Sequence, residues 1–249
     1  VKGSTRMNAL NTLLLGARAT LFWAGSIPST LLAGLLAPLA WLLPPRYRYP
    51  ATTLWNCFNR WWLEVTCGVK YQVLGRENIP TDVAFIIMAN HQSTWETFAI
   101  PCIFPQQLSW VMKRELLKIP FFGWGLRLIR PIAIDRGAGR AAVKQISHQG
   151  KALLQEGVCI VIFPEGTRVA PDVKAEYKIG GAILASHSGF PVLPVAKNAG
   201  KSWQRHAWIK QPGTITVSIG PAFSTKGLKA DAINQQAQDW IEAEKARLP

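Results

Sequence analysis

The N-terminal part of the chain carries one long apolar run followed by a helical stripe of large apolar side chains. No charged residue occurs between Arg18 and Arg46, a stretch long enough for a helix of about 20 residues to cross a bilayer core of roughly 30 Å. Pro28 and Pro38 interrupt the run, so a straight spanning helix is not assured. The stripe that follows recurs at helical spacing and consists of Trp55, Phe58, Trp62 and Val65.

This pattern predicts a helical hairpin over residues 8–67 that is embedded in one leaflet of a membrane. The aromatic residues favour this interpretation, because Trp and Tyr prefer the headgroup level of a bilayer. Two alternatives stay open. The first helix could span the membrane, or the two helices could form a core pair that packs only on protein.

From residue 69 onward, short β-rich runs alternate with helical stretches. Continuous apolar runs, such as residues 83–88 and 158–163, are typical of strands that are buried on both faces of a sheet. The expected strands are Val69–Leu74, Val83–Met88, Leu108–Met112, Ile132–Ile134, Val158–Phe163, Val192–Val195 and Ile215–Ile219. The expected helices are Glu96–Ile103, Arg140–Gln155, Tyr177–Ser188 and Ala230–Arg247. The alternation predicts an α/β fold with a mostly parallel sheet flanked by helices, preceded by the membrane-embedded hairpin.

The change of pattern near residue 68 divides the chain into two expected units, a hairpin over 7–67 and an α/β domain over 68–249. A chain of 249 residues is long enough for one sizeable α/β core and too short for two full catalytic domains. The residues before Met7 can be left over from cloning or from a mis-assigned start, so the chain proper is expected to begin at Met7.

The composition combines this apolar character with a high positive charge. The sequence is 49% hydrophobic, yet its formal net charge is +14, so apolar and basic features must be separated in space. This combination suits a membrane surface. A basic nucleic-acid-binding protein is the rival class, but 11 Trp and a long uncharged run are not needed to bind a phosphate backbone. We therefore expect a membrane partner and no nucleic acid.

The four cysteines show neither a CxxC pair nor a His at zinc-finger spacing, which argues against a structural metal. We expect all four to be buried, reduced thiols. Unpaired cysteines fit a protein that faces the cytosol, because secreted proteins of this size tend to pair them. These residues are Cys57, Cys67, Cys102 and Cys159.

A histidine stands where ligands bind in α/β proteins. His91 follows the expected strand 83–88, and Glu96 comes five residues later. A carboxylate on one ring nitrogen fixes the tautomer and stabilises the imidazolium, so the other nitrogen can act as a general base. Two simpler interpretations remain: a packed His, and a capping box in which Glu96 only supports the start of a helix that opens at Ser93.

A loop with an acid, a glycine and a guanidinium follows another buried strand, and further cations follow other strands. Arginine offers bidentate donors to phosphate, and Glu165 can accept a bond from a hydroxyl. Each of these residues taken singly is typical of a turn or of a solvated surface charge. Their shared position after strands favours an anion-binding pocket. The residues are Lys113, Arg136, Glu165, Gly166, Thr167, Arg168 and Lys178.

Four strings of residues together resemble the four sequence blocks of the glycerolipid acyltransferase family. They are Asn90-His91-Gln92-Ser93 with an acid at 96, Ile134-Asp135-Arg136, Phe163-Pro164-Glu165-Gly166-Thr167-Arg168 and Val192-Leu193-Pro194-Val195-Ala196. The segment Lys113-Arg114-Glu115-Leu116 leading to Pro120 resembles one found between the first two blocks in 1-acyl-sn-glycerol-3-phosphate acyltransferases. The resemblance spans about residues 69–200.

The resemblance implies transfer of a fatty acyl group from acyl-CoA or acyl-carrier protein to the sn-2 hydroxyl of 1-acyl-sn-glycerol-3-phosphate, which gives phosphatidic acid. It implies a place on the cytoplasmic face of the inner membrane. His91 matches the family's base, Lys113, Arg136 and Arg168 match its phosphate contacts, and Glu165 and Gly166 match its acceptor loop. Such a base takes the hydroxyl proton directly, so we expect neither a metal nor a cofactor, and the absence of a GxSxG elbow fits.

One position departs from the family pattern, which usually has Asp where this chain has Glu96. The longer side chain leaves other lysophospholipid acceptors open. A non-catalytic lipid-binding protein of the same fold would be expected to lose His91 or its acid, and both are present.

Near the C-terminus, basic residues interleave with tryptophans. This mixture predicts an interfacial patch for anionic lipids, in which each cation adds about 1 kcal/mol, or a surface for an acidic carrier protein. A plain exposed hairpin is the alternative. The residues are Lys197, Lys201, Trp203, Arg205, His206, Trp208 and Lys210.

Overall fold

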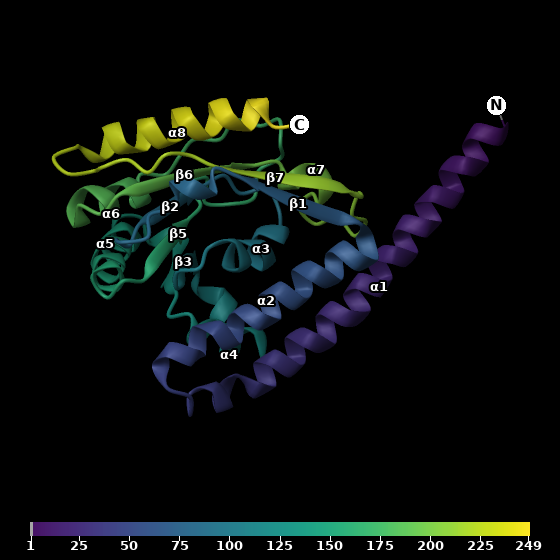
Figure 1. Ribbon diagram of the computed structural model, residues 1–249, viewed down its shortest axis with the longest axis horizontal. Helices are drawn as coiled ribbons and strands as arrows, with labels where there is room; N and C mark the ends of the chain where they lie inside the picture. The colour runs from purple at the N-terminus through teal and green to yellow at the C-terminus, as the bar shows by residue number, and fades with distance from the viewer. Residues whose placement is uncertain (1) are drawn as a thin grey trace.

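The computed structural model describes the backbone of residues 2–249 and the side chains of residues 10–249, and Val1 lies outside the described residues. Two antiparallel helices, α1 (Lys2–Ala40) and α2 (Pro45–Cys67), lie along one side of an α/β body (Figure 1). The N-terminal end of α1 extends beyond that body. The expected hairpin is therefore present, with its turn between Ala40 and Pro45.

Neither proline ends the first helix, although both interrupt the apolar run. Pro28 and Pro38 lie inside α1, which continues to Ala40. Side-chain hydroxyls supply hydrogen bonds near Pro28. The carbonyl of Ser26 accepts from Ser29 Oγ at 2.9 Å and from Thr30 Oγ1 at 2.7 Å. Side-chain hydroxyls and neighbouring helices are the usual means by which an apolar helix tolerates proline.

The second helix ends at a glycine that leads directly into the sheet. Gly68 has a φ of 69°, the left-handed conformation that favours glycine, and its N–H donates to the Glu64 carbonyl at 2.9 Å. Strand β1 begins at the next residue, Val69. The change of pattern near residue 68 is thus a real change from helix to strand.

The body contains a seven-stranded sheet with the order β1-β7-β6-β2-β5-β3-β4. Every neighbouring pair is parallel except β6 and β7, which confirms the mostly parallel sheet. All residues of the central strands β2 and β5 are buried, as their continuous apolar runs predict. The strands are β1 (Val69–Leu74), β2 (Ile86–Ala89), β3 (Leu108–Lys113), β4 (Ile132–Ile134), β5 (Cys159–Ile162), β6 (Val192–Lys197) and β7 (Gly213–Ile219).

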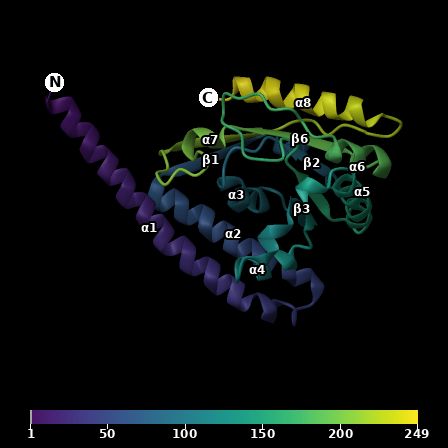
Figure 2. The ribbon, with the colours of Figure 1, turned by 180° about the vertical axis from the view of Figure 1, so that it is seen from behind.

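Helices cover both faces of the sheet (Figure 2). Helices α5, α6 and α8 pack together on the side away from the hairpin, whereas α3 and α4 lie between the sheet and the hairpin. The helices of the body are α3 (Trp95–Ile103), α4 (Phe122–Leu128), α5 (Arg140–Gln155), α6 (Gly180–Ser188), α7 (Ala199–Ser202) and α8 (Ala230–Arg247). Single 3-10 turns lie at η1 (Arg76–Asn78), η2 (Arg114–Lys118) and η3 (Arg136–Ala138).

Helix α6 begins at Gly180, so the expected start at Tyr177 is wrong. Tertiary contacts hold the preceding residues outside the helix. The Tyr177 hydroxyl donates to Glu242 Oε1 at 3.1 Å, and the N–H of Lys178 donates to the Pro164 carbonyl at 2.8 Å. Local propensity does not report such contacts.

Two of the four cysteines are paired, so the expectation that all four are reduced is wrong. Cys57 of α2 and Cys102 of α3 form a disulfide with a Cα–Cα distance of 5.8 Å. The pair forms because α2 packs on α3, which residue spacing along the chain does not reveal. Cys67 and Cys159 are free and buried, and burial raises the pKa of the Cys159 thiol to about 11.

Candidate active site

The site lies at the carboxyl ends of neighbouring parallel strands. Strand β2 ends at Ala89, two residues before His91, and β5 ends at Ile162, three residues before Glu165. Because β2 pairs with β5 in parallel, the two loops leave the sheet at the same edge. This edge is where ligands bind in α/β folds.

Glu96 uses its two carboxylate oxygens for two purposes. Oε2 is hydrogen-bonded to Nδ1 of His91, while Oε1 accepts from the backbone N–H groups of Gln92 at 2.8 Å and Ser93 at 3.0 Å. Ser93 Oγ in turn accepts from the Trp95 N–H at 3.2 Å. Glu96 therefore contacts both the imidazole of His91 and the backbone just before α3, which begins at Trp95 and not at the expected Ser93.

The Glu96 carboxyl favours its charged form although it is fully buried. Burial opposes ionisation, but the charge of Lys197, followed by that of His91, outweighs it and lowers the pKa of Glu96 below its usual value. A buried carboxylate that faces an imidazole is the arrangement that stabilises an imidazolium.

The ring of His91 lies against an aromatic side chain and its backbone is held by a second acid. The His91 and Phe163 rings are stacked, with centroids 4.1 Å apart and planes 8° apart. Glu165 Oε2 accepts from the His91 backbone N–H at 2.7 Å, so this acid positions the loop and does not touch the ring nitrogen that Glu96 occupies. Burial raises the pKa of Glu165 to about 7.

A cavity of about 820 Å³ opens beside His91, between the hairpin and the body. Apolar side chains of α1, α2 and α4 form most of its wall, among them Leu32, Leu36 and Phe122. Lys113, at the end of β3, and Arg136, just after β4, also line it. The structure therefore brings the expected base and two of the expected cations to one apolar cavity.

The remaining predicted residues lie in the loop after β5 and do not appear in the wall of this cavity. Arg168 donates from Nη1 to Thr94 Oγ1 at 2.6 Å, which ties the loop to the start of α3. Gly166 has a φ of 71°, where a side chain would be strained and would also meet Lys178. Thr167 and Lys178 are exposed.

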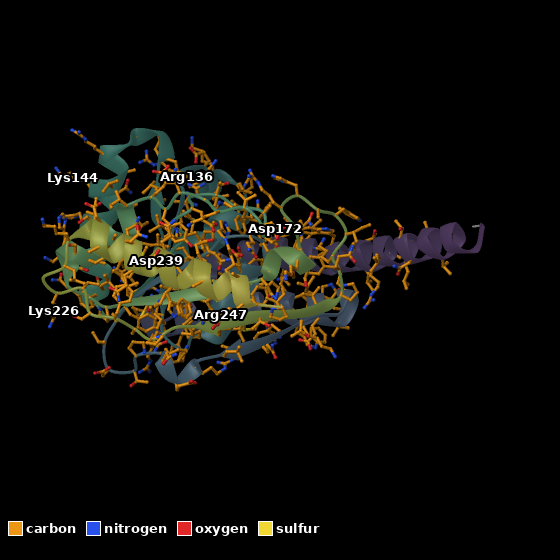
Figure 3. The ribbon with its side chains drawn as sticks, turned by 90° about the horizontal axis from the view of Figure 1, so that it is seen from above. Arg136, Lys144, Asp172, Lys226, Asp239 and Arg247 are labelled. Atoms are coloured by element: carbon orange, nitrogen blue, oxygen red, sulfur yellow. A yellow bond between two sulfur atoms is a disulfide. The ribbon has the colours of Figure 1, made fainter. Side chains whose placement is uncertain are left out.

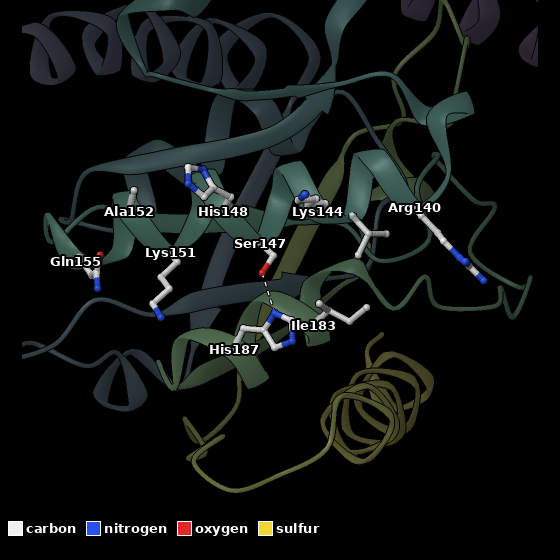
Figure 4. Close-up of a pocket in the computed structure, with 10 residues that line it drawn as sticks. Arg140, Lys144, Ser147, His148, Lys151, Ala152, Gln155, Ile183 and His187 are labelled. Carbon is white, nitrogen blue, oxygen red and sulfur yellow. Dashed lines mark hydrogen bonds between the residues drawn. The ribbon is translucent and has the colours of Figure 1, made fainter.

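A second groove, of about 710 Å³, lies on the far face between α5 and α6 (Figure 4). Arg140, Lys144 and Lys151 line it, and Ser147 Oγ lies 3.0 Å from His187 Nδ1. Arg136 lies one turn before the start of α5 and apart from Lys144 (Figure 3). The groove contains none of the residues that the sequence singled out.

The basic and aromatic cluster near the C-terminus is not one exposed patch, so that expectation is wrong for its buried members. Lys197, Trp203 and Lys210 are 0%, 3% and 1% exposed. Lys210 Nζ lies 4.4 Å from the centroid of the Trp23 ring and donates to the Trp208 carbonyl at 2.7 Å, so it joins α1 to the body. Lys197 belongs to a fully buried strand beside His91, and the apolar run 192–196 was the signal for its burial.

Comparisons with known proteins identify the family of this chain. A family model described as Acyltransferase matches residues 70–198. The 1-acyl-sn-glycerol-3-phosphate acyltransferase of Pseudomonas aeruginosa is 45% identical over 214 residues, which are 84% of this chain and 82% of that protein. The enzyme of the same name from Saccharomyces cerevisiae is 27% identical over 179 residues, 71% of this chain and 59% of that protein.

The fold agrees as well. The crystal structure of the 1-acyl-sn-glycerophosphate (LPA) acyltransferase PlsC from Thermotoga maritima is similar with a TM-score of 0.75, at 25% sequence identity, over 96% of each chain. The family model covers the sheet from β1 to β6, including His91, Arg136 and Arg168. With more than half of its length matched by the family model and a 45% identical relative, the chain belongs to the acyltransferase family.

Proposed function

We propose that this enzyme transfers a fatty acyl group from an acyl thioester to the sn-2 hydroxyl of 1-acyl-sn-glycerol-3-phosphate, which gives phosphatidic acid. The observation that carries the proposal is the His91–Glu96 pair, which borders an apolar cavity that also contains Lys113 and Arg136. An acceptor with one acyl chain and a phosphate group needs an apolar surface for the chain and cations for the phosphate. The names of the P. aeruginosa and T. maritima relatives support the same acceptor.

His91 acts as the general base. Its Nδ1 carries the proton that Glu96 accepts, so Nε2 is free to take the proton of the acceptor hydroxyl as the oxygen attacks the thioester carbonyl. The tetrahedral intermediate then collapses, the carbon–sulfur bond breaks, and the imidazolium returns the proton to the leaving thiolate. Each turnover thus forms one ester and one thiol, and it requires no protein nucleophile.

The cations hold the acceptor's phosphate, and this orients its hydroxyl toward His91. Lys113 and Arg136 make the direct contacts, because they line the cavity. Arg168 is bound to Thr94 and acts on the loop at the start of α3. The loop residues Glu165, Gly166, Thr167 and Lys178 shape the edge of the site beside His91. The departure from Asp to Glu96 does not argue against this acceptor, since Glu96 reaches His91.

The N-terminal unit, residues 7–67, places the site at a membrane, and residues 68–249 form the catalytic unit. Within the described residues, Leu10–Ala40 is long and apolar enough to cross a membrane. Only 22% of its most apolar 18-residue segment is buried against protein, so most of that segment is exposed. Exposed apolar side chains of this density mark a lipid-facing surface. They include Leu13, Leu21, Leu35, Leu42, Leu54 and Trp61. We propose that the hairpin lies in one leaflet, on the cytoplasmic face of the inner membrane.

The donor is acyl-CoA or acyl-carrier protein. The test is an assay of the full chain in detergent, with each labelled donor offered against a panel of lysophospholipids. We expect the fastest transfer to 1-acyl-sn-glycerol-3-phosphate and no transfer to acceptors that lack a terminal phosphate. Equal rates with lysophosphatidylcholine would contradict the acceptor assignment, and no transfer to any acceptor would contradict the function.

A further inference from the structure

The most unusual charged residue near the site is the lysine that ends β6. Lys197 is fully buried, and its ammonium group has no place in the wall of the cavity beside His91. Burying an ammonium group without partners raises the free energy of the folded state. The groups that contact Lys197 therefore indicate its role. All of those partners belong to the residues that surround His91.

The neighbour of His91, Asn90, is joined to Lys197 by three hydrogen bonds. Asn90 Nδ2 donates to the Lys197 carbonyl at 2.8 Å, Asn90 Oδ1 accepts from the Lys197 N–H at 3.0 Å, and Lys197 Nζ donates to the Asn90 carbonyl. These bonds connect residues 107 positions apart in the sequence. They fix the backbone that leads directly into His91.

The ammonium group also lies behind the catalytic pair. Lys197 Nζ is 3.9 Å from Glu96 Oε1, the oxygen that does not bind His91. It lies 5.0 Å from the centroid of the Phe163 ring, the same ring that stacks on His91. Lys197 therefore touches Glu96, the aromatic support of His91 and the residue before His91, while it stays out of reach of a substrate in the cavity.

We propose that Lys197 is a positioning residue for acyl transfer, whose buried positive charge keeps the His91–Glu96 pair in the state that accepts the hydroxyl proton. This inference rests on the proposed function of His91 as the base.

The electrostatic argument concerns the pair as a unit. With a neutral imidazole and a carboxylate, the pair carries one negative charge, and after it takes up a proton it carries none. A positive charge 3.9 Å away stabilises the first state relative to the second. When that charge is removed, the pair takes up its proton at a higher pH than in the wild type. The protonated pair cannot act as a base.

Other charged groups face the same pair and remain in place when Lys197 is replaced. Glu165 opposes Lys197, since it binds the His91 backbone and interacts with both Glu96 and Lys197. Arg168 interacts with Glu96, and Lys113 and Arg136 lie on the cavity side. Burial lowers the pKa of Lys197, and the charges of Glu96 and Glu165 oppose that shift. Among the lysines and arginines in the described part of the chain, Lys197 forms an ion pair with Glu96, and it lies outside the cavity wall.

The test compares pH–rate profiles of the full chain in detergent, with the donor thioester that the wild type uses and 1-acyl-sn-glycerol-3-phosphate as acceptor. For Lys197→Met we expect the acidic limb of kcat to move to higher pH by about one to three units, the usual effect of a charge at this distance. At alkaline pH, kcat should recover to within about tenfold of the wild type, with the KM values little changed. Lys197→Arg should keep the limb within half a unit or so of the wild type.

Lys210→Met is the matched control, because it also removes a buried lysine, but one that is enclosed by Trp23 and Trp203 and whose charge interacts with Cys67. It should lower the melting temperature and leave the acidic limb in place. An unshifted limb in active Lys197→Met, or an equal shift in Lys210→Met, would overturn the inference. Wild-type protein that transfers no acyl group would instead overturn the proposed function.

A double variant covers the case in which Lys197→Met does not fold. Lys197→Met combined with Glu96→Gln removes both buried charges, which restores neutrality in the core. If Lys197 acts through Glu96, the double variant should lose less than about threefold in kcat relative to Glu96→Gln alone. A further loss of tenfold or more, in a folded protein, would show that Lys197 acts independently of the pair and would overturn the inference.

Discussion

Glu165 binds the backbone of His91 and not its ring, with Oε2 accepting from the His91 N–H at 2.7 Å. Two buried acids therefore flank one histidine and differ in their protonation. Lys197 and His91 hold the pKa of Glu96 below its usual value against the effect of burial, whereas burial raises the pKa of Glu165 to about 7. The acid with the lowered pKa supports the ring, and the acid with the raised pKa fastens the loop.

The raised pKa of Glu165 predicts a pH dependence of stability. Between its ordinary value of 4.5 and about 7, the folded protein keeps a proton that the unfolded chain has released. Stability therefore falls as the pH rises through this window, by up to about 3 kcal/mol, and levels off above it. In Glu165→Gln this contribution is absent. We expect the melting temperature of the wild type, relative to that of the variant, to fall from pH 4.5 to 7, and parallel curves would contradict the assignment.

Replacement of His91 should separate catalysis from folding. His91→Ala is expected to lower kcat by about 100-fold or more, because the general base is lost. The melting temperature should change little, since the ring is partly exposed at a strand end. His148→Ala, in the groove between α5 and α6, is the matched control and should retain full activity. A folded His91→Ala protein with normal turnover would rule out the mechanism.

Glu96→Gln tests the two uses of this side chain. A Gln oxygen can still accept from the Gln92 and Ser93 N–H groups, but its NH₂ group then faces His91 Nδ1 and favours the wrong tautomer. We expect kcat to fall by about 100-fold or more and the melting temperature to fall as well, because the buried Lys197 loses its counter-charge. Glu96→Asp should give an intermediate loss. Full activity of Glu96→Gln would mean that Glu96 is only a cap.

Arg136 should act on the acceptor. Arg136→Ala is expected to raise KM for 1-acyl-sn-glycerol-3-phosphate by about tenfold or more and to leave KM for the donor nearly unchanged. Arg136→Lys should restore binding only in part, since a point charge replaces a planar fork. Lys226→Ala, well away from Arg136 (Figure 3), is the control for loss of a surface cation. An effect confined to donor KM would contradict the assignment of this pocket.

Arg168 should behave differently from Arg136, because it is bound to Thr94 Oγ1 and does not line the cavity. We expect Arg168→Ala and Thr94→Val to give the same loss, and the double variant to lose no more than either single one. Measuring kcat and KM for the two single variants and the double variant tests this expectation. Additive losses would show that Arg168 also binds the acceptor directly.

The one-leaflet hairpin predicts that both ends of residues 7–67 lie on the cytosolic side. A protease-cleavable tag at the N-terminus should be cut by added protease in inverted membrane vesicles and protected in intact cells. A cleavable tag at the C-terminus should behave in the same way. A tag at position 7 that is accessible only from the far side would show a spanning helix instead.

Local patterns determined most of the fold. The predicted bounds of β1, β4, α5 and α8 agree with the structure, because strand and helix periodicity and turn residues act over a few neighbouring positions. The His91–Glu96 contact was also predictable, since Glu96 comes only five positions after His91 and a helix start brings them together. The continuity of α1 was not, because whether a proline breaks a helix depends on what surrounds it.

Contacts between residues far apart in the sequence could not be predicted from local patterns. Cys57 pairs with Cys102 because α2 packs on α3, and Arg168 binds Thr94 because β5 lies beside β2. Lys197 was expected in an interfacial patch, yet its place in β6 next to β2 puts it behind Glu96. Local sequence predicted all seven strands and the helices α1, α2, α3, α5, α6 and α8, but it did not predict the short helices α4 and α7. Burial and charge pairing depend on contacts between residues far apart in the chain, and these exist only once the sheet has assembled.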